Sequence, residues 1–167
     1  PMVLSLSPGD LVRKEDMPKL KQGNMLRVTA DIWDEERGID QCFKAWKKWE
    51  GFSGPGFWID MDLICFGKLQ LMSPSPGERV EAEDKHAALA GKGFTRNSQL
   101  TRDQMYTFIT MRYMAASPLM MGGALVDLDP FSLSLLTHPE MLSCNQNGVM
   151  GRIISDKDGI IIAQTPP

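Results

Sequence analysis

One stretch of the chain, Leu-Arg-Val-Thr-Ala-Asp-Ile-Trp at residues 26 to 33, alternates apolar and polar side chains in the manner of a β-strand. Successive side chains of a strand point to opposite faces, so Arg27, Thr29 and Asp31 share one face and the apolar residues share the other. The apolar face is expected to pack on a core, which leaves the polar face for another purpose. This stretch therefore predicts both a strand and a functional surface.

A second stretch, Phe57 to Gly67, repeats this pattern with Trp58, Asp60 and Asp62 on one face between apolar residues. A single aspartate near the end of a strand most often caps the following helix or bonds to a turn. Three carboxylates over the two stretches, on the same side as an arginine and a tryptophan, are harder to explain as caps. We therefore interpret these side chains as one candidate site.

Helices are predicted to alternate with the strands. The acidic residues 34 to 36 favour a helix N-terminus, and apolar side chains follow them at helical spacing. Thr101-Arg102-Asp103-Gln104 is a capping box that opens a second helix, which has to end by Ser117 because Pro118 follows. Residues 67 to 100, which separate the strands from this second helix, are rich in proline, glycine and charge and predict a long loop.

Three short elements are predicted in the last third of the chain. Leu119-Met120-Met121 is expected to form a short buried strand before a pair of glycines. Asp129-Pro130 opens a short helix, with aspartate as its cap and with Leu133 and Leu136 pointing inward. Residues 152 to 155 and 160 to 163 flank a turn signal and predict a β-hairpin.

Strands that alternate with helices predict a parallel sheet and an α/β fold. Four such units make half of an eightfold (β/α)8 TIM barrel, which takes about 250 residues when complete. The carboxylates lie at the C-terminal ends of their strands, where barrel enzymes place their chemistry. Acids that move protons, a tryptophan plane and an arginine together predict a site for a sugar.

Composition disfavours several classes of partner. The formal net charge of -3 and the absence of basic runs disfavour nucleic acid and anionic membranes. The longest apolar runs fall far short of the roughly 18 residues of a membrane-spanning helix. The three cysteines are isolated, so neither a disulfide framework nor a zinc site is implied, and no cofactor is expected. The first residues carry no signal-peptide pattern, so the sequence leaves localisation open, an extracytoplasmic one included.

Four segments, taken in order, resemble the second half of the barrel of the α-galactosidases and α-N-acetylgalactosaminidases, the glycoside hydrolase family 27 and 36 clan. They are Leu-Arg-Val-Thr-Ala-Asp-Ile (26–32), Gly-Pro-Gly-Phe-Trp-Ile-Asp-Met-Asp-Leu (54–63), Ala-Ser-Pro-Leu-Met-Met (116–121) and the run from Leu135 to Gln146. The resemblance implies the C-terminal half of a (β/α)8 barrel over residues 1–150. It also implies the start of a β-sandwich domain over residues 151–167.

The resemblance implies a role for each residue of the candidate site. The family's strand motif Arg-x-x-x-Asp supplies the general acid/base, which makes Asp31 that residue and Arg27 a ligand of a sugar hydroxyl. Asp62 corresponds to a sugar-binding residue, with Trp58 and Asp60 in support. The expected partner is therefore a carbohydrate.

Departures from the family concern both the substrate and the mechanism. Galactosidases tend to carry a glutamate near Ser7, and the small residue here resembles the acetylgalactosaminidase version, so the resemblance leaves open whether the sugar is an α-galactoside or its 2-acetamido analogue. A retaining glycosidase needs two carboxyl groups about 5 to 5.5 Å apart. The family's nucleophile lies in a Lys-x-Asp strand motif, and the only match, Lys14-Glu15-Asp16, is expected to form a solvated loop instead.

Three hypotheses follow from these patterns. In the first, the chain is part of a retaining α-glycosidase that carries the acid/base Asp31 without the nucleophile, and the fragment alone is inactive. In the second, it is a non-catalytic carbohydrate-binding or structural half-barrel. In the third, it is an unrelated α/β protein whose clustered acids bind a divalent cation. Under the first two, the chain is expected to need the missing N-terminal barrel half or to self-associate.

Overall fold

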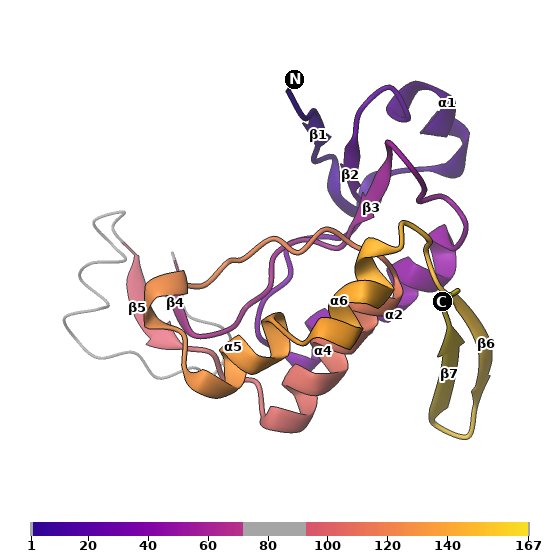
Figure 1. Ribbon diagram of the computed structural model, residues 1–167. Helices are drawn as coiled ribbons and strands as arrows, with labels where there is room; N and C mark the ends of the chain where they lie inside the picture. Colours follow the sequence, from indigo (N-terminus) through magenta and orange to yellow (C-terminus); the bar gives the residue numbers. More distant parts are fainter. Residues whose placement is uncertain (1, 72–92, 167) are drawn as a thin grey trace.

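The computed structural model describes residues 2–71 and 93–166 (Figure 1). Its strands are β1 (Ser5–Leu6), β2 (Met25–Arg27), β3 (Trp58–Asp60), β4 (Lys68–Leu71), β5 (Phe94–Asn97), β6 (Arg152–Lys157) and β7 (Ile160–Gln164). Its α-helices are α1 (Met17–Leu20), α2 (Glu36–Trp49), α4 (Arg102–Met114), α5 (Pro130–Leu136) and α6 (Pro139–Gln146). Single turns of 3-10 helix cover Gly9–Leu11, Lys14–Asp16 and Leu125–Asp127.

The predicted parallel sheet is confirmed for the first three strands. They pair in the order β1-β2-β3, which is also their order in the chain, and Leu26 lies opposite both Leu6 and Ile59. An isolated parallel bridge between Ile64 and Met121 adds a fourth segment with the same direction. The sheet therefore grows by one βα unit at a time.

Helix α2 packs on the apolar face of this sheet. Leu26, Val28 and Ile59 from the strands are buried together with Ala45 and Trp49 from the helix. The opposite face carries the polar residues of the same strands, as the alternation predicts. One side of the sheet is therefore core, and the other is free to form a site.

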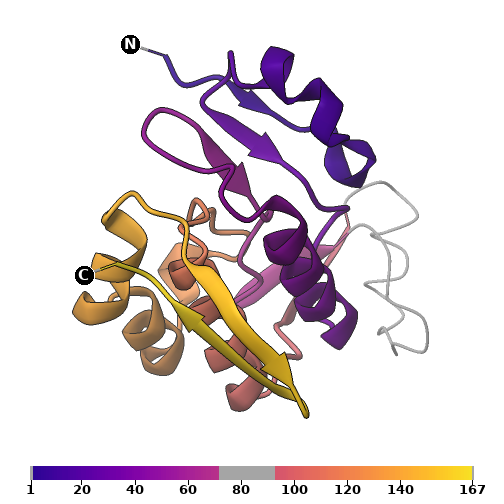
Figure 2. The same cartoon turned by 90° about the vertical axis from the view of Figure 1, so that its right-hand side faces the viewer.

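A second core surrounds helix α4, which contacts α2, α5 and α6. Trp46 of α2 is almost fully buried there, and its indole Nε1 donates a hydrogen bond of 2.8 Å to the carbonyl of Gly151. This bond ties α2 to the C-terminal hairpin β6–β7, which lies across the helices in Figure 2. The predicted hairpin is confirmed, with longer strands than expected.

The predicted helix starts are confirmed at two positions. Thr101 Oγ1 accepts from Gln104 N at 3.2 Å, and Gln104 Oε1 accepts from Thr101 N at 2.9 Å, which completes the capping box. The carboxylate of Asp129 accepts from the amides of Phe131 and Ser132 and caps α5. Both signals are local, since each cap satisfies backbone donors within its own first turn.

The two strands that carry the candidate site are shorter than predicted. The stretch 26 to 33 contributes only Leu26 and Arg27 to β2, which begins at Met25, and the stretch 57 to 67 contributes only Trp58–Asp60 to β3. Asp62 has a φ of 67°, in the left-handed region, which ends the extended conformation. The face alternation that the sequence indicates therefore stops at Asp60.

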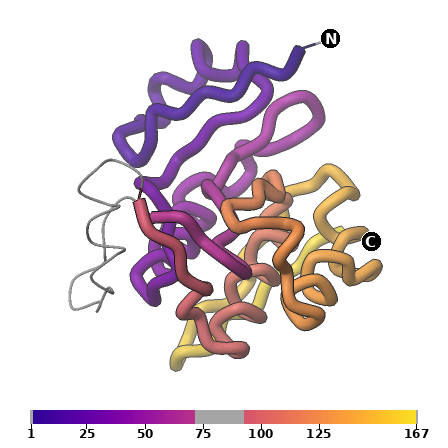
Figure 3. The backbone as a smooth tube through the Cα atoms, turned by 90° about the vertical axis from the view of Figure 1, so that its left-hand side faces the viewer, coloured from indigo at the N-terminus to yellow at the C-terminus, as the bar shows by residue number. Residues whose placement is uncertain are grey.

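The loop predicted over residues 67 to 100 is partly wrong, because strands β4 and β5 pair antiparallel within it (Figure 3). Leu69 and Leu71 of β4 are buried while Lys68 and Gln70 are exposed, so the four residues alternate as a half-buried strand does. Residues 72–92 lie outside the described part of the chain.

Two inward-facing predictions are also wrong. Leu119–Met121 forms one isolated bridge rather than a buried strand, and the side chain of Met120 is half exposed. In α5 Leu133 is half exposed, whereas Leu135 is buried and the predicted Leu136 packs partly buried against the same core. Residues two apart in a helix do not share a face, so Leu133 points away from the core that Leu135 enters. None of the helices in the described ranges combines the length and apolar character of a membrane span.

Candidate functional site

The structure brings Arg27, Asp31 and Asp62 together at the carboxyl ends of β2 and β3. The Arg27 Nη1 atom lies 2.8 Å from Asp31 Oδ1 and 3.3 Å from Asp62 Oδ2. One guanidinium nitrogen therefore joins carboxylates from two neighbouring strands. The Asp31 side chain is 70% exposed, whereas the side chain of Asp62 is 12% exposed, so the two acids differ in access to solvent.

Asp62 is held from three directions. Its Oδ2 accepts a hydrogen bond of 2.8 Å from the amide of Ile32, and its own amide donates to Asp60 Oδ1 at 2.8 Å. Its left-handed backbone conformation turns the side chain toward Arg27 rather than along the strand. Aspartate tolerates this conformation better than most residues, because its short side chain bonds locally.

Burial dominates the electrostatics of Asp60. Its side chain is buried opposite Arg27 in the sheet register, and desolvation raises the pKa of this carboxyl. The amide of Asp62 opposes this shift, as do the charges of Arg112 and Arg27. For Arg27, burial lowers the pKa of the guanidinium, but the bond to Asp31 and the charge of Asp62 more than offset it, so the net shift is upward.

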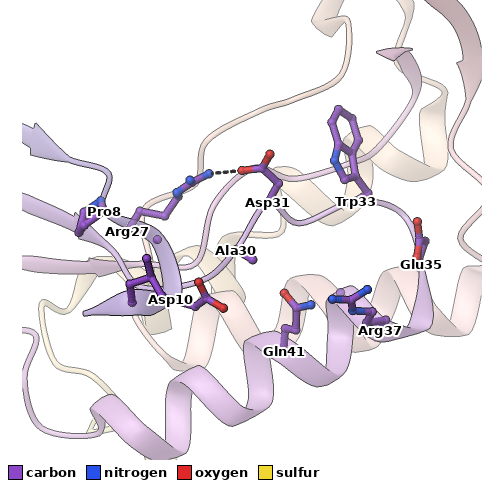
Figure 4. A pocket seen from close by; sticks show the side chains of 12 residues that line it. Pro8, Asp10, Arg27, Ala30, Asp31, Trp33, Glu35, Arg37 and Gln41 are labelled. Carbon is purple, nitrogen blue, oxygen red and sulfur yellow. Dashed lines mark hydrogen bonds and ion pairs between the residues drawn. The ribbon is translucent and has the colours of Figure 1, made fainter. Parts of the chain in front are cut away.

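A cavity of about 490 Å³ opens beside this cluster (Figure 4). Its wall combines the turn after β1, the segment that follows β2 and the first turns of α2. The side chains labelled in Figure 4 are those of Pro8, Asp10, Arg27, Ala30, Asp31, Trp33, Glu35, Arg37 and Gln41. Ligand pockets in proteins typically measure about 300 to 1,000 Å³, so this volume suits a small polar molecule.

The other two predicted site residues do not join the cluster. Trp58 begins β3 and lines a second cavity of about 460 Å³, with Met25 and Asn145 among its neighbours. Ser7 is exposed and directly precedes Pro8, which lines the first cavity.

Sequence reasoning missed two buried charges near the site. Asp34, predicted only as part of an acidic helix start, is buried and accepts from Arg96 Nη1 at 2.5 Å and from the Gln99 amide at 2.6 Å. Arg112 is fully buried, and its Nη2 donates to the carbonyls of Met61 and Leu63. For Arg112, the sequence did offer a signal, because this arginine lies on an otherwise apolar helix face.

The described residues contain no group of three or more histidine, cysteine or acidic side chains arranged to hold a metal ion. The hypothesis of a divalent-cation protein therefore gains no support from the residues in this part of the chain. The cluster instead offers two carboxylates and a cation within hydrogen-bond reach of one another, a set suited to polar hydroxyl groups.

No protein-family model matches the chain. Alpha-galactosidase 2 from Arabidopsis thaliana is 22% identical over 139 residues, which cover 82% of this chain and 28% of that protein. A family 27 β-L-arabinopyranosidase from Geobacillus stearothermophilus, solved by crystallography, is 31% identical with a TM-score of 0.82. It matches 99% of this chain, which covers 34% of the enzyme. A substituted form of that enzyme was solved in complex with arabinose.

A proposed α-N-acetylgalactosaminidase from Bacillus halodurans is 30% identical, with a TM-score of 0.67, and again 99% of this chain covers 34% of that one. The chain therefore spans about a third of the length of these relatives. The resemblance to the clan of α-galactosidases and α-N-acetylgalactosaminidases is confirmed, with an arabinopyranosidase added to it.

Proposed function

We propose that this chain, a homologue of the family 27 glycoside hydrolases, carries the acid/base residue of a retaining α-glycosidase site. The observation that carries the proposal is the pairing of Arg27 with both Asp31 and Asp62 at the carboxyl ends of neighbouring parallel strands. Barrel enzymes place catalytic groups at this end of their strands. The whole activity is a proposal, since the chain spans about a third of its relatives.

In this proposal, Asp31 protonates the oxygen of the leaving group and later removes a proton from the attacking water. Its exposed carboxylate at the wall of the cavity leaves room for both partners. Arg27 donates to a hydroxyl of the bound sugar, and Asp62 accepts from another. The carboxylate of Asp60 accepts from the Asp62 amide and so supports Asp62. Trp58, at the start of β3, remains a proposed support of the sugar site.

We assign residues 1–150 to the second half of a (β/α)8 barrel and residues 151–167 to the start of a β-sandwich domain. The chain-order parallel sheet and the parallel bridge of Ile64 to Met121 support the first assignment, and the hairpin β6–β7 supports the second. The nucleophile comes from outside this chain. Lys14–Asp16, the only Lys-x-Asp in the sequence, forms a 3-10 turn in which Asp16 pairs with Arg13 at 3.2 Å.

The proposed substrate is a terminal α-galactoside or its 2-acetamido analogue. A β-L-arabinopyranoside has the ring hydroxyls of an α-D-galactopyranoside in the same orientation and lacks only the hydroxymethyl group. One hydroxyl-binding pair, Arg27 with Asp62, therefore suits all three sugars that the names of the relatives indicate. We place Ser7, beside the cavity, near the 2-substituent.

Sugar binding tests this proposal on the 167-residue chain. Amide resonances of Asp31 and Ile32 are expected to shift on titration with D-galactose, N-acetyl-D-galactosamine or L-arabinose, and to stay in place with D-glucose. Asp62→Ala is expected to weaken binding by more than about 1 kcal/mol, because Arg27 would be left without one of its partners. Identical spectra with and without all three sugars would contradict the proposal.

The second candidate is a non-catalytic carbohydrate-binding or structural half-barrel. The placement of Lys14–Asp16 in a partly exposed turn favours it, since the described residues then include no assigned nucleophile. Sugar binding without hydrolysis, even after the rest of a family 27 barrel is supplied, would select this candidate.

A further inference from the structure

Arg112 is a buried cation in the middle of the second core. Its side chain is fully buried on α4, and its Cζ lies 3.7 Å from the centroid of the Phe108 ring. Within residues 2–71 and 93–166, no carboxylate lies within ion-pair distance of its guanidinium. Burying a charge without a close counter-ion is costly, and an apolar side chain of similar length would fill the same space. Stability alone therefore does not account for an arginine at this position.

The hydrogen bonds of Arg112 converge on the residues that flank Asp62. One nitrogen, Nη2, donates to the carbonyl of Met61 at 2.9 Å and to the carbonyl of Leu63 at 3.0 Å. Between these two carbonyls, Asp62 adopts its left-handed conformation, which costs a non-glycine residue free energy and persists only where the surroundings impose it. The two bonds fix the chain on both sides of that residue.

A continuous path of contacts connects Arg112 with the proposed site. From the clamped segment, the carboxylate of Asp62 reaches the Ile32 amide at 2.8 Å and Arg27 Nη1 at 3.3 Å, and Arg27 in turn holds Asp31. A displacement of the segment 61 to 63 would therefore move the group that binds the sugar and release the partner of the proposed acid/base.

We propose that Arg112 is a positioning residue for the sugar-binding carboxylate of Asp62, which it aims at Arg27 by clamping the backbone of Met61 and Leu63. This inference rests on the proposed function for its consequence in sugar binding, but the geometry of Asp62 is testable without any sugar. Arginine suits the task because its guanidinium stays charged when buried, whereas a buried lysine readily loses its proton. The Nε and Nη1 atoms of Arg112 are buried and find no acceptor among the described residues, so the two carbonyls are its bonding targets there.

The test compares three variants of the 167-residue chain: Arg112→Met, Arg112→Lys and Tyr113→Phe. The control, Tyr113→Phe, lies next to Arg112, is equally buried, and loses a bond to the carbonyl of Leu135 that is remote from Asp62. The first readout is the amide of Ile32, which donates to Asp62. Arg112→Met is expected to shift its resonance and to lower its protection from hydrogen exchange by about tenfold, as for one lost hydrogen bond. Tyr113→Phe should leave both unchanged.

The second readout is the dissociation constant for D-galactose, measured where each variant is folded. Arg112→Met is expected to weaken binding by about tenfold, the ratio for one hydrogen bond to a charged group, and Arg112→Lys to restore part of it because an amine can still donate to both carbonyls. If Arg112→Met does not fold, the comparison of Arg112→Lys with Tyr113→Phe decides in the same way. An Ile32 amide that responds no more to either Arg112 variant than to Tyr113→Phe would overturn the inference. If the unsubstituted chain binds no sugar but the Arg112 variants still perturb the Ile32 amide, the proposed function is refuted. The positioning of Asp62 by Arg112 is then still supported.

Discussion

The ionisation of Asp60, a buried acid of the site, opposes folding. Burial raises the pKa of this carboxyl above its ordinary value of 3.8, and the Asp62 amide together with Arg112 and Arg27 only partly offsets that shift. A carboxyl with a raised pKa binds its proton more tightly in the folded state than in the unfolded state. The free energy of unfolding therefore falls as the pH rises from 3.8 through the folded pKa.

Asp60→Asn is expected to remove this penalty. Asparagine cannot ionise, and its Oδ1 can still accept the hydrogen bond from the Asp62 amide. The variant should be more stable than the original chain at neutral pH, and the difference should shrink as the pH falls through the folded pKa toward 3.8. Urea unfolding at a series of pH values measures this difference directly. A difference that does not change with pH would show that the charge of Asp60 carries no penalty.

At the same scale, Asp31 is expected to be the proton-transferring group. A chimera in which this chain replaces the matching third of the Geobacillus enzyme supplies the remainder of the barrel. In the chimera, Asp31→Asn should lower turnover by roughly 100 to 10,000-fold for substrates with poor leaving groups, which need general-acid help. Activated aryl glycosides barely need protonation and should be affected far less. Asp16→Asn serves as the control for loss of a carboxylate, and an equal loss on both classes of substrate would remove Asp31 from this role.

At the scale of single elements, the sequence predicts what local chemistry decides. Thr101 and Asp129 predict helix starts, because their side-chain oxygens accept hydrogen bonds from backbone amides two or three residues further on. The length of β3 could not be predicted in this way, since the segment around the left-handed turn at Asp62 makes its contacts with Arg27, Ile32 and Arg112, which are distant in the sequence. The alternation of side chains predicted that Asp62 and Trp58 both lie near Arg27. The structure places Asp62 against Arg27, whereas Trp58 lines a different cavity.

Thr101→Ala measures how far the local cap of α4 contributes to stability. Loss of the Thr101 hydroxyl should lower the free energy of unfolding by about 1 kcal/mol, since the Gln104 amide loses its cap acceptor, whereas the bond from the backbone amide of residue 101 to Gln104 Oε1 can persist. Thr107→Ala is a matched control on the same helix: its hydroxyl bonds only to the carbonyl of Asp103, and alanine is the better helix former. Chemical denaturation of both variants gives the comparison. Equal effects of the two substitutions would show that the cap is not a distinct source of stability.

At the scale of the whole molecule, the sheet has an apolar edge. Met2, Val3 and Leu4, which run into β1, are 94%, 67% and 53% exposed, and among the described residues β1 pairs with β2 alone. Val3 and Met25 also line the cavity beside Trp58, which lies at the amino ends of the strands. An unpaired edge with apolar side chains recruits other chains. The relatives, about three times as long, provide further chain that could cover such a surface.

As an isolated 167-residue polypeptide, the chain is therefore expected to self-associate and to be catalytically inactive. Light scattering across a range of concentrations should report dimers or larger species, because pairing at the β1 edge removes apolar surface from water. Val3→Lys should shift the population toward monomer, since a charged side chain on an edge strand opposes pairing. Ile154→Lys is the matched control, because Ile154 is 60% exposed on the distant hairpin β6–β7. Inactivity follows from the retaining mechanism, in which Asp31 alone cannot form the covalent intermediate. A stable monomer that hydrolyses an aryl α-galactoside would overturn both the half-barrel assignment and the placement of the nucleophile outside this chain.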